Sequence, residues 1–245
     1  MTSESGGTLY LDDSYLKEWE ATVAKADKKF IVLDRTAFYP NSGGQPWDTG
    51  EMVRASDGMV FRVVFVGKFG GSISHEVNNE GLKPGDRVKC RIDWERRYRH
   101  MRMHTAAHLL SGVVERETGA LITGNQLGED HSRIDLNIEG FDKDRFMGYV
   151  KKSNELIRKN LPVKVSYVPR EDALRDKSLF KLAGVEPEKM LPPSVINVRI
   201  VDIVGLIREA DGGTHVKSLK EVGEIRFERA ENKGKDNRRV YFTLA

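Results

Sequence analysis

The chain has 245 residues, 39% of them hydrophobic, with 40 Lys and Arg against 37 Asp and Glu and a formal net charge of +3. This length allows one large or two small domains with real cores, and the near-balance of charge excludes a strongly basic surface over the whole molecule. The single cysteine, Cys90, excludes an internal disulfide framework and a metal site with several thiolates. Without a signal-peptide pattern or an apolar run of about 18 residues, we expect a cytoplasmic protein with no membrane association.

The first part of the chain is rich in short β-like runs that alternate with turn signals. The runs lie at 9–11, 30–34, 59–67, 73–77 and 87–93. Several short strands at this spacing, with little helical periodicity, predict a small N-terminal β-barrel over residues 1–92. Within it, the paired Gly43 and Gly44 can let the backbone pass close to a ligand while Gln45 presents its amide, although a hairpin turn is the simpler interpretation.

Residues 93–119 predict a helix that carries two histidines one turn apart. Asp93 is suited to cap the first turn, and Gly119 is suited to end the helix in the left-handed conformation. His104 and His108 lie four apart at the edge of an apolar stripe, so one face can offer both imidazoles to a metal ion. Two half-exposed surface histidines are the alternative. The threonine at position 105 excludes an HExxH metalloprotease motif.

The rest of the chain mixes helices with strands that pair as hairpins, which predicts an α+β domain over residues 93–245 with an antiparallel sheet. Two strands are expected within 121–138, an amphipathic helix over 142–159, strands at 163–168 and 195–203 with a short helix near 170–182 between them, and a hairpin over 221–245.

A second pair of possible metal ligands lies far from the first in sequence. Asp211 and His215 flank two glycines, which permit a tight bend that turns both side chains inward. With His104 and His108 they make a four-coordinate site possible, and two separated pairs are more specific than one. A β-turn with an incidental histidine is the alternative.

These motifs, in this order, resemble the editing domain of alanyl-tRNA synthetase and its free-standing relatives, the AlaX alanyl-tRNA editing proteins. They are SGGQPWDTG at 42–50, HTAAHLL at 104–110, GGTH at 212–215, GEIRF at 223–227 and KGK at 233–235. Because the glycine-rich segment precedes the histidine helix, the resemblance is to the medium form of the family. It implies hydrolysis, in trans, of tRNA(Ala) mischarged with serine or glycine. A non-catalytic tRNA-binding module with a structural zinc is the alternative function.

The resemblance also implies a zinc cofactor. His104, His108 and His215 correspond to the ligands of the family, and Asp211 stands where the family usually has cysteine. Aspartate ligates zinc through oxygen, which makes a harder and less tightly held ligand set. No side chain is assigned a catalytic role, and the reacting group is expected to be a metal-bound water.

Further residues are expected to contact the substrate. The partner is mischarged tRNA(Ala), mainly its acceptor stem and CCA end, and no obligatory protein partner is expected. Candidates to bind the serine hydroxyl are Thr105, Thr123 and Gln126, and residues expected to line the substrate or to select it are Gly43, Gly44, Gln45, Gly212, Gly213 and Thr214. Cations expected to contact tRNA phosphates are Arg97, Arg102, Lys217, Lys233, Lys235 and Arg238.

Overall fold

The computed structural model describes residues 7–234 and 237–245, and the chain divides into two compact units. The first unit ends at His100 and the second begins at Met101, so the division falls inside helix α2 (Trp94–Thr118). The α+β fold predicted from the sequence is confirmed. Among the described residues, no helix is both long and apolar enough to span a membrane.

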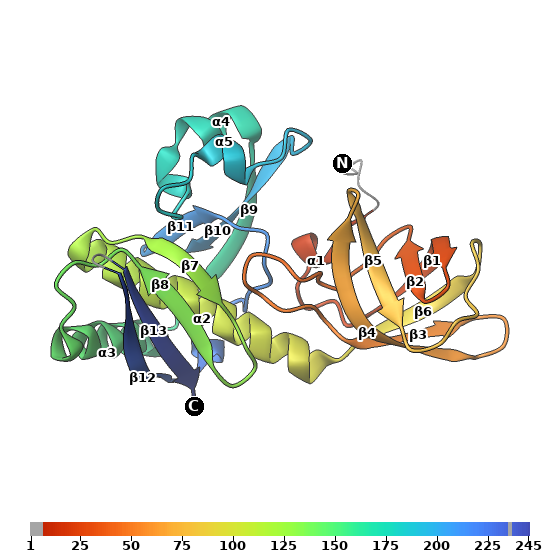
Figure 1. Ribbon diagram of the computed structural model, residues 1–245, viewed down its shortest axis with the longest axis horizontal. Helices are drawn as coiled ribbons and strands as arrows, with labels where there is room; N and C mark the ends of the chain where they lie inside the picture. Colours follow the sequence, from red (N-terminus) through yellow and green to blue (C-terminus); the bar gives the residue numbers. More distant parts are fainter. Residues whose placement is uncertain (1–6, 235–236) are drawn as a thin grey trace. The chain divides into compact units, whose positions relative to one another are not determined.

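The first unit is a closed antiparallel barrel (Figure 1). Its strands are β1 (Glu18–Asp27), β2 (Phe30–Leu33), β3 (Gly50–Arg54), β4 (Val60–Phe69), β5 (Ser72–Val77) and β6 (Arg87–Ile92), hydrogen-bonded in the order β1-β2-β5-β4-β3-β6. Side chains alternate between solvent and core, as in β6, where Val88, Cys90 and Ile92 point inward. Cys90 is therefore a core residue.

Two details of the barrel differ from the sequence prediction. The run 9–11 is not a strand but the short helix α1 (Leu9–Asp12). Strands β1 and β3 were missed. In β1 the outward-facing Glu18 and Glu20 alternate with the buried Trp19 and Ala21. Alternating charges of this kind break up the apolar run that marks a strand.

A buried ion pair lies between the barrel and the first turns of α2. Arg97 is fully buried, and its Nε lies 3.0 Å from both carboxylate oxygens of Asp48. The guanidinium also donates to the carbonyl oxygens of Ser14 and Ala37, and the amide of Tyr39 donates to Asp48. The prediction that Arg97 contacts tRNA phosphates is therefore wrong, since its guanidinium is enclosed and fully engaged.

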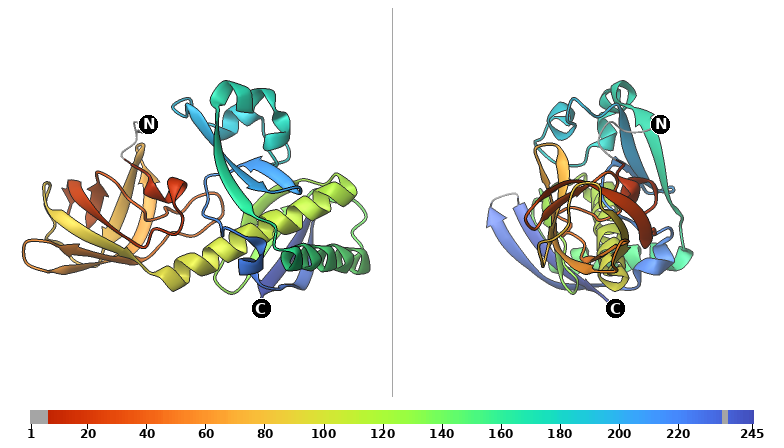
Figure 2. Two further views of the ribbon diagram at one scale, coloured as in Figure 1. Left: turned by 180° about the vertical axis from the view of Figure 1, so that it is seen from behind. Right: turned by 90° about the vertical axis from the view of Figure 1, so that its right-hand side faces the viewer.

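The second unit contains two antiparallel sheets. One has the order β12-β13-β8-β7, with β7 (Ile122–Gln126), β8 (Ser132–Leu136), β12 (Ile225–Gly234) and β13 (Asn237–Leu244). The other has the order β11-β10-β9, with β9 (Val163–Pro169), β10 (Asn197–Ile203) and β11 (Ile207–Ala210). In Figure 2, β9 and β10 run side by side and the short helices α4 (Arg170–Arg175) and α5 (Pro187–Met190) lie at one end of them.

Among its described residues, this unit also contains α3 (Lys143–Lys159) and the 3-10 turns η1 (Lys177–Leu179) and η2 (Leu219–Val222). The amphipathic helix predicted over 142–159 is confirmed as α3. Its N-terminus is capped by Asp142, which accepts a hydrogen bond from the amide of Arg145, and its C-terminus ends at Asn160 in the left-handed conformation.

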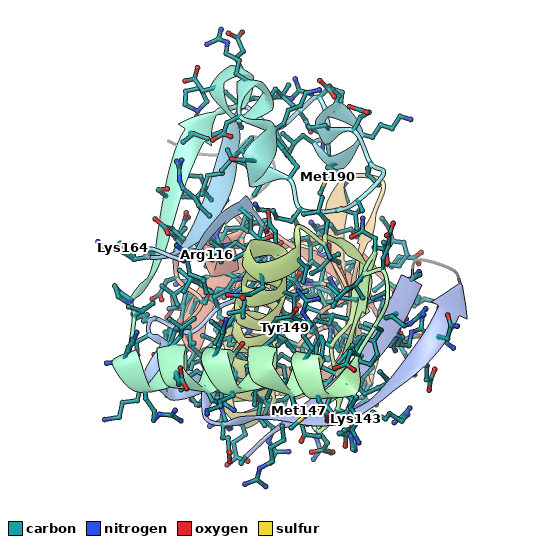
Figure 3. The ribbon with its side chains drawn as sticks, turned by 90° about the vertical axis from the view of Figure 1, so that its left-hand side faces the viewer. Arg116, Lys143, Met147, Tyr149, Lys164 and Met190 are labelled. Atoms are coloured by element: carbon teal, nitrogen blue, oxygen red, sulfur yellow. The ribbon has the colours of Figure 1, made fainter. Side chains whose placement is uncertain are left out.

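Helix α2 runs through the interior of the second unit. Asp93 caps it by accepting from the amide of Arg96, and Gly119 ends it with a φ of 76°, as predicted. Every residue from Met103 to Val114 is buried, and Figure 3 shows α2 behind α3. A helix that is buried on all sides belongs to the core. The alternative of half-exposed surface histidines is therefore wrong.

Candidate metal centre

The structure brings together the four side chains that the sequence suggested as metal ligands. His104 and His108 lie on α2, Asp211 follows β11, and His215 lies in the loop before η2. One ligand atom from each lies within 4.8 Å of all the others, and we call this group the His/Asp cluster. The three imidazoles are buried, and the Asp211 side chain is 19% exposed.

The spacing within the His/Asp cluster suits a small cation. Nε2 of His104 and of His108 lie 3.7 and 3.9 Å from Oδ1 of Asp211, and Nε2 of His215 lies 3.0 Å from Oδ2. Ligand atoms about 2 Å from a tetrahedral ion lie roughly 3.3 Å from one another. Three imidazole nitrogens and a carboxylate oxygen are a donor set that divalent transition metals accept.

The loop after β11 approaches α2 closely at Gly213. A Cβ atom at this position would lie 2.0 Å from Cε1 of His104, so only glycine fits there. The amide of Gly213 also donates to Oδ2 of Asp211, which orients the carboxylate. Gly213 therefore serves close packing against His104, whereas a Cβ atom at Gly212 would meet nothing within 4 Å. Neither glycine has a positive φ, so the bend between Asp211 and His215 does not use the left-handed conformation.

The hydrogen bonds of Thr105 fix the tautomer of His215. The Thr105 hydroxyl lies 3.0 Å from the carbonyl oxygen of Met101 and 3.2 Å from the amide of Val216. Its one proton goes to the carbonyl, so the hydroxyl oxygen must accept from Nδ1 of His215, 3.1 Å away. With the proton on Nδ1, the lone pair of Nε2 is directed at Asp211.

This arrangement places two acceptors against each other. Burial lowers the pKa of His215 to about 4, although the neighbouring Asp211 carboxylate acts to raise it, so the imidazole is neutral near pH 7. Burial would raise the pKa of Asp211, but the nearby imidazoles hold it well below its usual value, so the carboxylate is charged. A lone pair and a carboxylate 3.0 Å apart repel each other unless a cation lies between them. The residues therefore fit a metal ion.

A second carboxylate, which the sequence analysis missed, holds His108. Glu209 on β11 is buried and pairs with Nδ1 of His108, on the far side of the ring from Asp211. Burial alone would lower the pKa of His108, but Glu209 and then Asp211 raise it to about 9. Contacts of this kind, from a carboxylate to the outer nitrogen of a ligand histidine, are typical around metals. In the sequence, Glu209 could have been noticed as a charged residue two positions after Ile207, on the same inward-facing side of β11.

A cation that the sequence analysis also missed lies beside the carboxylate. Arg199 on β10 is buried, and its guanidinium donates to the main-chain oxygen of Asp211 over 2.9 Å and lies 3.8 Å from Oδ2. It therefore fixes the chain at Asp211 and adds positive charge next to the carboxylate.

The residues predicted to contact the substrate differ in burial. Thr105 and Thr214 are buried, and the Thr105 hydroxyl is engaged as described. Thr123 and Gln126 are exposed on β7, where they contact Asn237 and Arg133. The hydrogen bonds of the Thr105 hydroxyl to Met101, His215 and Val216 favour a role in positioning His215 over a hydrogen bond to substrate.

The glycine-rich loop of the barrel is a two-residue hairpin. Gly43 and Gly44 have positive φ, and Ser42 and Gln45 exchange two main-chain hydrogen bonds across them. Both glycines are exposed at the tip, whereas the Gln45 side chain is fully buried. The expectation that Gln45 presents its amide to a ligand is therefore wrong.

The predicted tRNA-binding cations of the second unit are mostly on its surface. Arg102 donates to the carbonyl oxygens of Val222 and Ala245 and so holds main chain. Lys217 and Lys233 are exposed, and Arg238 donates to Asn232 at the β12–β13 turn. Lys235 lies outside the described residues.

Comparisons with known proteins relate both the N-terminal and the C-terminal part of the chain to tRNA synthetases and alanyl-tRNA editing proteins. Residues 10–96 match the family model described as tRNA synthetases class II (A), and residues 198–241 match the one described as threonyl and alanyl tRNA synthetase second additional domain. The alanyl-tRNA editing protein AlaX-M of Methanosarcina barkeri is 53% identical over 96% of this chain and 98% of its own length. The AlaX-M of Saccharolobus solfataricus is 40% identical over the same shares. The alanine–tRNA ligase of Pyrococcus furiosus is 37% identical over 91% of this chain but only 24% of its own.

Proposed function

The chain belongs to the family of AlaX-M alanyl-tRNA editing proteins, and we propose that it hydrolyses serine or glycine from wrongly charged tRNA(Ala) at a zinc ion held by the His/Asp cluster. The observation that carries this proposal is the contact between the unprotonated Nε2 of His215 and the Asp211 carboxylate, which needs a cation. Zinc suits three imidazoles and one carboxylate.

The reaction has a physical rationale in the limits of amino-acid selection. A site that binds the methyl group of alanine admits the smaller glycine, and it rejects serine, which adds only a hydroxyl, by about 10²-fold or less. A second site that removes the wrong amino acid by hydrolysis restores accuracy. The hydrolysis consumes one water molecule and yields the free amino acid and the tRNA with its terminal hydroxyl.

The residues of this chain act by holding the metal in a fixed geometry. A bound zinc ion supplies Lewis acidity to the ester or to water. Thr105 and Glu209 fix the rings of His215 and His108 so that each Nε2 points into the cluster. Because these contacts exist without the ion, little reorganisation is needed when it binds.

The proposed tRNA contacts are made by cations of the second unit. Lys217, Lys233, Lys235 and Arg238, with Arg102 where its main-chain bonds permit, would contact phosphates of the acceptor stem near the CCA end. Thr123 and Gln126 are the proposed partners of the serine hydroxyl, and the exposed Gly43-Gly44 tip is proposed to help select between serine and glycine.

A second candidate is a tRNA-binding module in which the zinc is structural. Four protein ligands would favour it, because a structural site is closed whereas a catalytic one keeps a position open. The partial exposure of Asp211 argues for an open position. Activity separates the two functions, since a structural zinc supports binding without hydrolysis.

The deciding experiment measures deacylation of Ser-tRNA(Ala), Gly-tRNA(Ala) and Ala-tRNA(Ala) with zinc present. We expect hydrolysis of the serine and glycine esters and not of the alanine ester, abolished by His104→Ala. The matched control is His131→Ala, which removes a histidine that is 65% exposed and paired with Glu228. Binding of tRNA without any hydrolysis would favour the binding module, and hydrolysis that survives His104→Ala would contradict the zinc proposal.

A further inference from the structure

The sheet that carries Glu209 and Asp211 extends beyond the buried cluster. In the order β11-β10-β9, β9 is the edge strand (Figure 1). Directly paired residues point to the same face of a sheet. Tyr167 pairs with Arg199, whose carbonyl oxygen accepts from the amide of Asp211, the residue directly after β11, so these three residues form one row. Val165, Val201 and Glu209 form the next row.

Burial along these two rows changes sharply at β9. Arg199, Val201 and Glu209 are buried, whereas Tyr167 is 46% and Val165 is 43% exposed. The opposite face of the sheet is covered near this point by a core that includes Phe180, Val198 and Ile200. The face that holds the cluster therefore emerges into solvent as an apolar, aromatic surface made of Val165 and Tyr167, which we call the β9 shelf.

The β9 shelf lies at a distance from the cluster that fits the substrate. Strands are about 4.8 Å apart, so two strand spacings separate Tyr167 from Asp211 by roughly 10 Å. Asp211 is also more exposed than the three histidines, so the cluster is most open at this residue. In the proposed substrate, the ester and the adenine ring of the terminal nucleotide are joined by a single ribose.

From this placement we infer that the β9 shelf binds the terminal adenine of the tRNA, with Tyr167 stacking on the base and Val165 contacting its edge. Aromatic rings stack on unpaired bases in single-stranded nucleic acids, and the CCA end is single-stranded. The inference rests on the proposed tRNA substrate and adds the residue that holds its last base.

The binding of uncharged tRNAs, which contain no ester to hydrolyse, tests whether the β9 shelf holds the terminal adenine. Uncharged tRNA(Ala) and the same tRNA lacking its terminal adenosine would be titrated against the wild type, Tyr167→Ala and Tyr167→Phe. We expect the wild type and Tyr167→Phe to bind the complete tRNA about tenfold more tightly than the shortened one, and Tyr167→Ala to bind both alike. Tyr167→Thr, which keeps a residue suited to a strand, repeats the test independently.

The control is Ile196→Ala, which removes a 70% exposed apolar side chain just before β10 and should keep the preference for the complete tRNA. Equal weakening of both tRNAs by Tyr167→Ala, or no weakening, would overturn the shelf. So would a wild type that does not distinguish the two tRNAs. Hydrolysis of Ser-tRNA(Ala) by a wild type without this preference would overturn the shelf alone, whereas the expected preference without hydrolysis would leave the shelf and refute the proposed activity.

Discussion

Two groups of buried polar residues in this chain differ in how their hydrogen-bonding capacity is used. The Arg97–Asp48 pair in the first unit is closed, since the guanidinium and the carboxylate bind each other and nearby main-chain groups. In the His/Asp cluster, by contrast, the outer ring nitrogens of His215 and His108 are held by Thr105 and Glu209, while Nε2 of His215 and the Asp211 carboxylate face each other as two acceptors. A buried charge that is paired within the protein is costly to unpair, whereas two buried acceptors that face each other need a cation between them.

The largest effect on stability is expected from opening the closed pair. Arg97→Ala leaves the carboxylate of Asp48 buried without its cation, which should cost about 3–5 kcal/mol in free energy of unfolding. Urea denaturation measures this change. Arg99→Ala, which alters an exposed arginine on the same helix, should change the free energy of unfolding by less than about 0.5 kcal/mol. Similar losses in the two variants would show that the pair is not what stabilises this unit.

Removing the Glu209 carboxylate should lower the zinc affinity of the His/Asp cluster without abolishing zinc binding. Glu209→Ala leaves Nδ1 of His108 without its partner, and we expect a 10- to 100-fold loss of zinc affinity, on the order reported for such contacts. Glu209→Gln, which can still accept from the ring, should lose less. Zinc competition with a chelator gives the affinities, with Asp202→Asn on β10 as the carboxylate control. An unchanged affinity in Glu209→Ala would remove Glu209 from the site.

The pH dependence of zinc binding follows from the His108 pair. Without metal, the pKa of His108 is raised to about 9, so the ring is doubly protonated at neutral pH, whereas His215, at about 4, is not. Zinc must displace the Nε2 proton of His108, and the metal-bound state therefore holds fewer protons. We expect zinc affinity to rise about tenfold per pH unit up to about pH 9 and then to level off. A flat profile between pH 6 and 8 would contradict this assignment.

The smallest effect is expected from the neutral contact to His215. Thr105→Val removes the hydroxyl that accepts from Nδ1, a hydrogen bond worth about 0.5–1.5 kcal/mol, or roughly 2- to 12-fold in zinc affinity. Thr105→Ser should retain most of it. Deacylation of serine and glycine esters should fall by the same factor if Thr105 only positions His215. A loss of deacylation with the serine ester but not with the glycine ester would instead indicate that Thr105 binds the serine hydroxyl.

Much of this architecture follows from the sequence because it depends on local patterns. The α+β class, the barrel and helices α2 and α3 are marked by turns, caps and periodicity, such as Asp142 at the start of α3. The ligand pairs His104 with His108 and Asp211 with His215 are each spaced by four residues, which suggested one four-coordinate site, and the family resemblance supported the same ligands.

What the sequence did not reveal depends on contacts between distant segments. Arg97 resembled a surface cation until Asp48, 49 residues earlier, was placed beside it. Glu209 and Arg199 become part of the site only when β10 and β11 pack on α2, and the register that aligns Tyr167 with Arg199 is set by tertiary pairing. Gln45 gave no local sign that its side chain would be buried.

The most direct test of the His/Asp cluster follows metal and chemistry together. The protein would be freed of metal with a chelator and then titrated with zinc while hydrolysis of Ser-tRNA(Ala) is recorded. We predict no hydrolysis at the start, a linear rise to one equivalent of zinc per chain, and a plateau thereafter. Full activity in the metal-free protein, or zinc binding at one equivalent with no hydrolysis, would contradict a metal-dependent editing site.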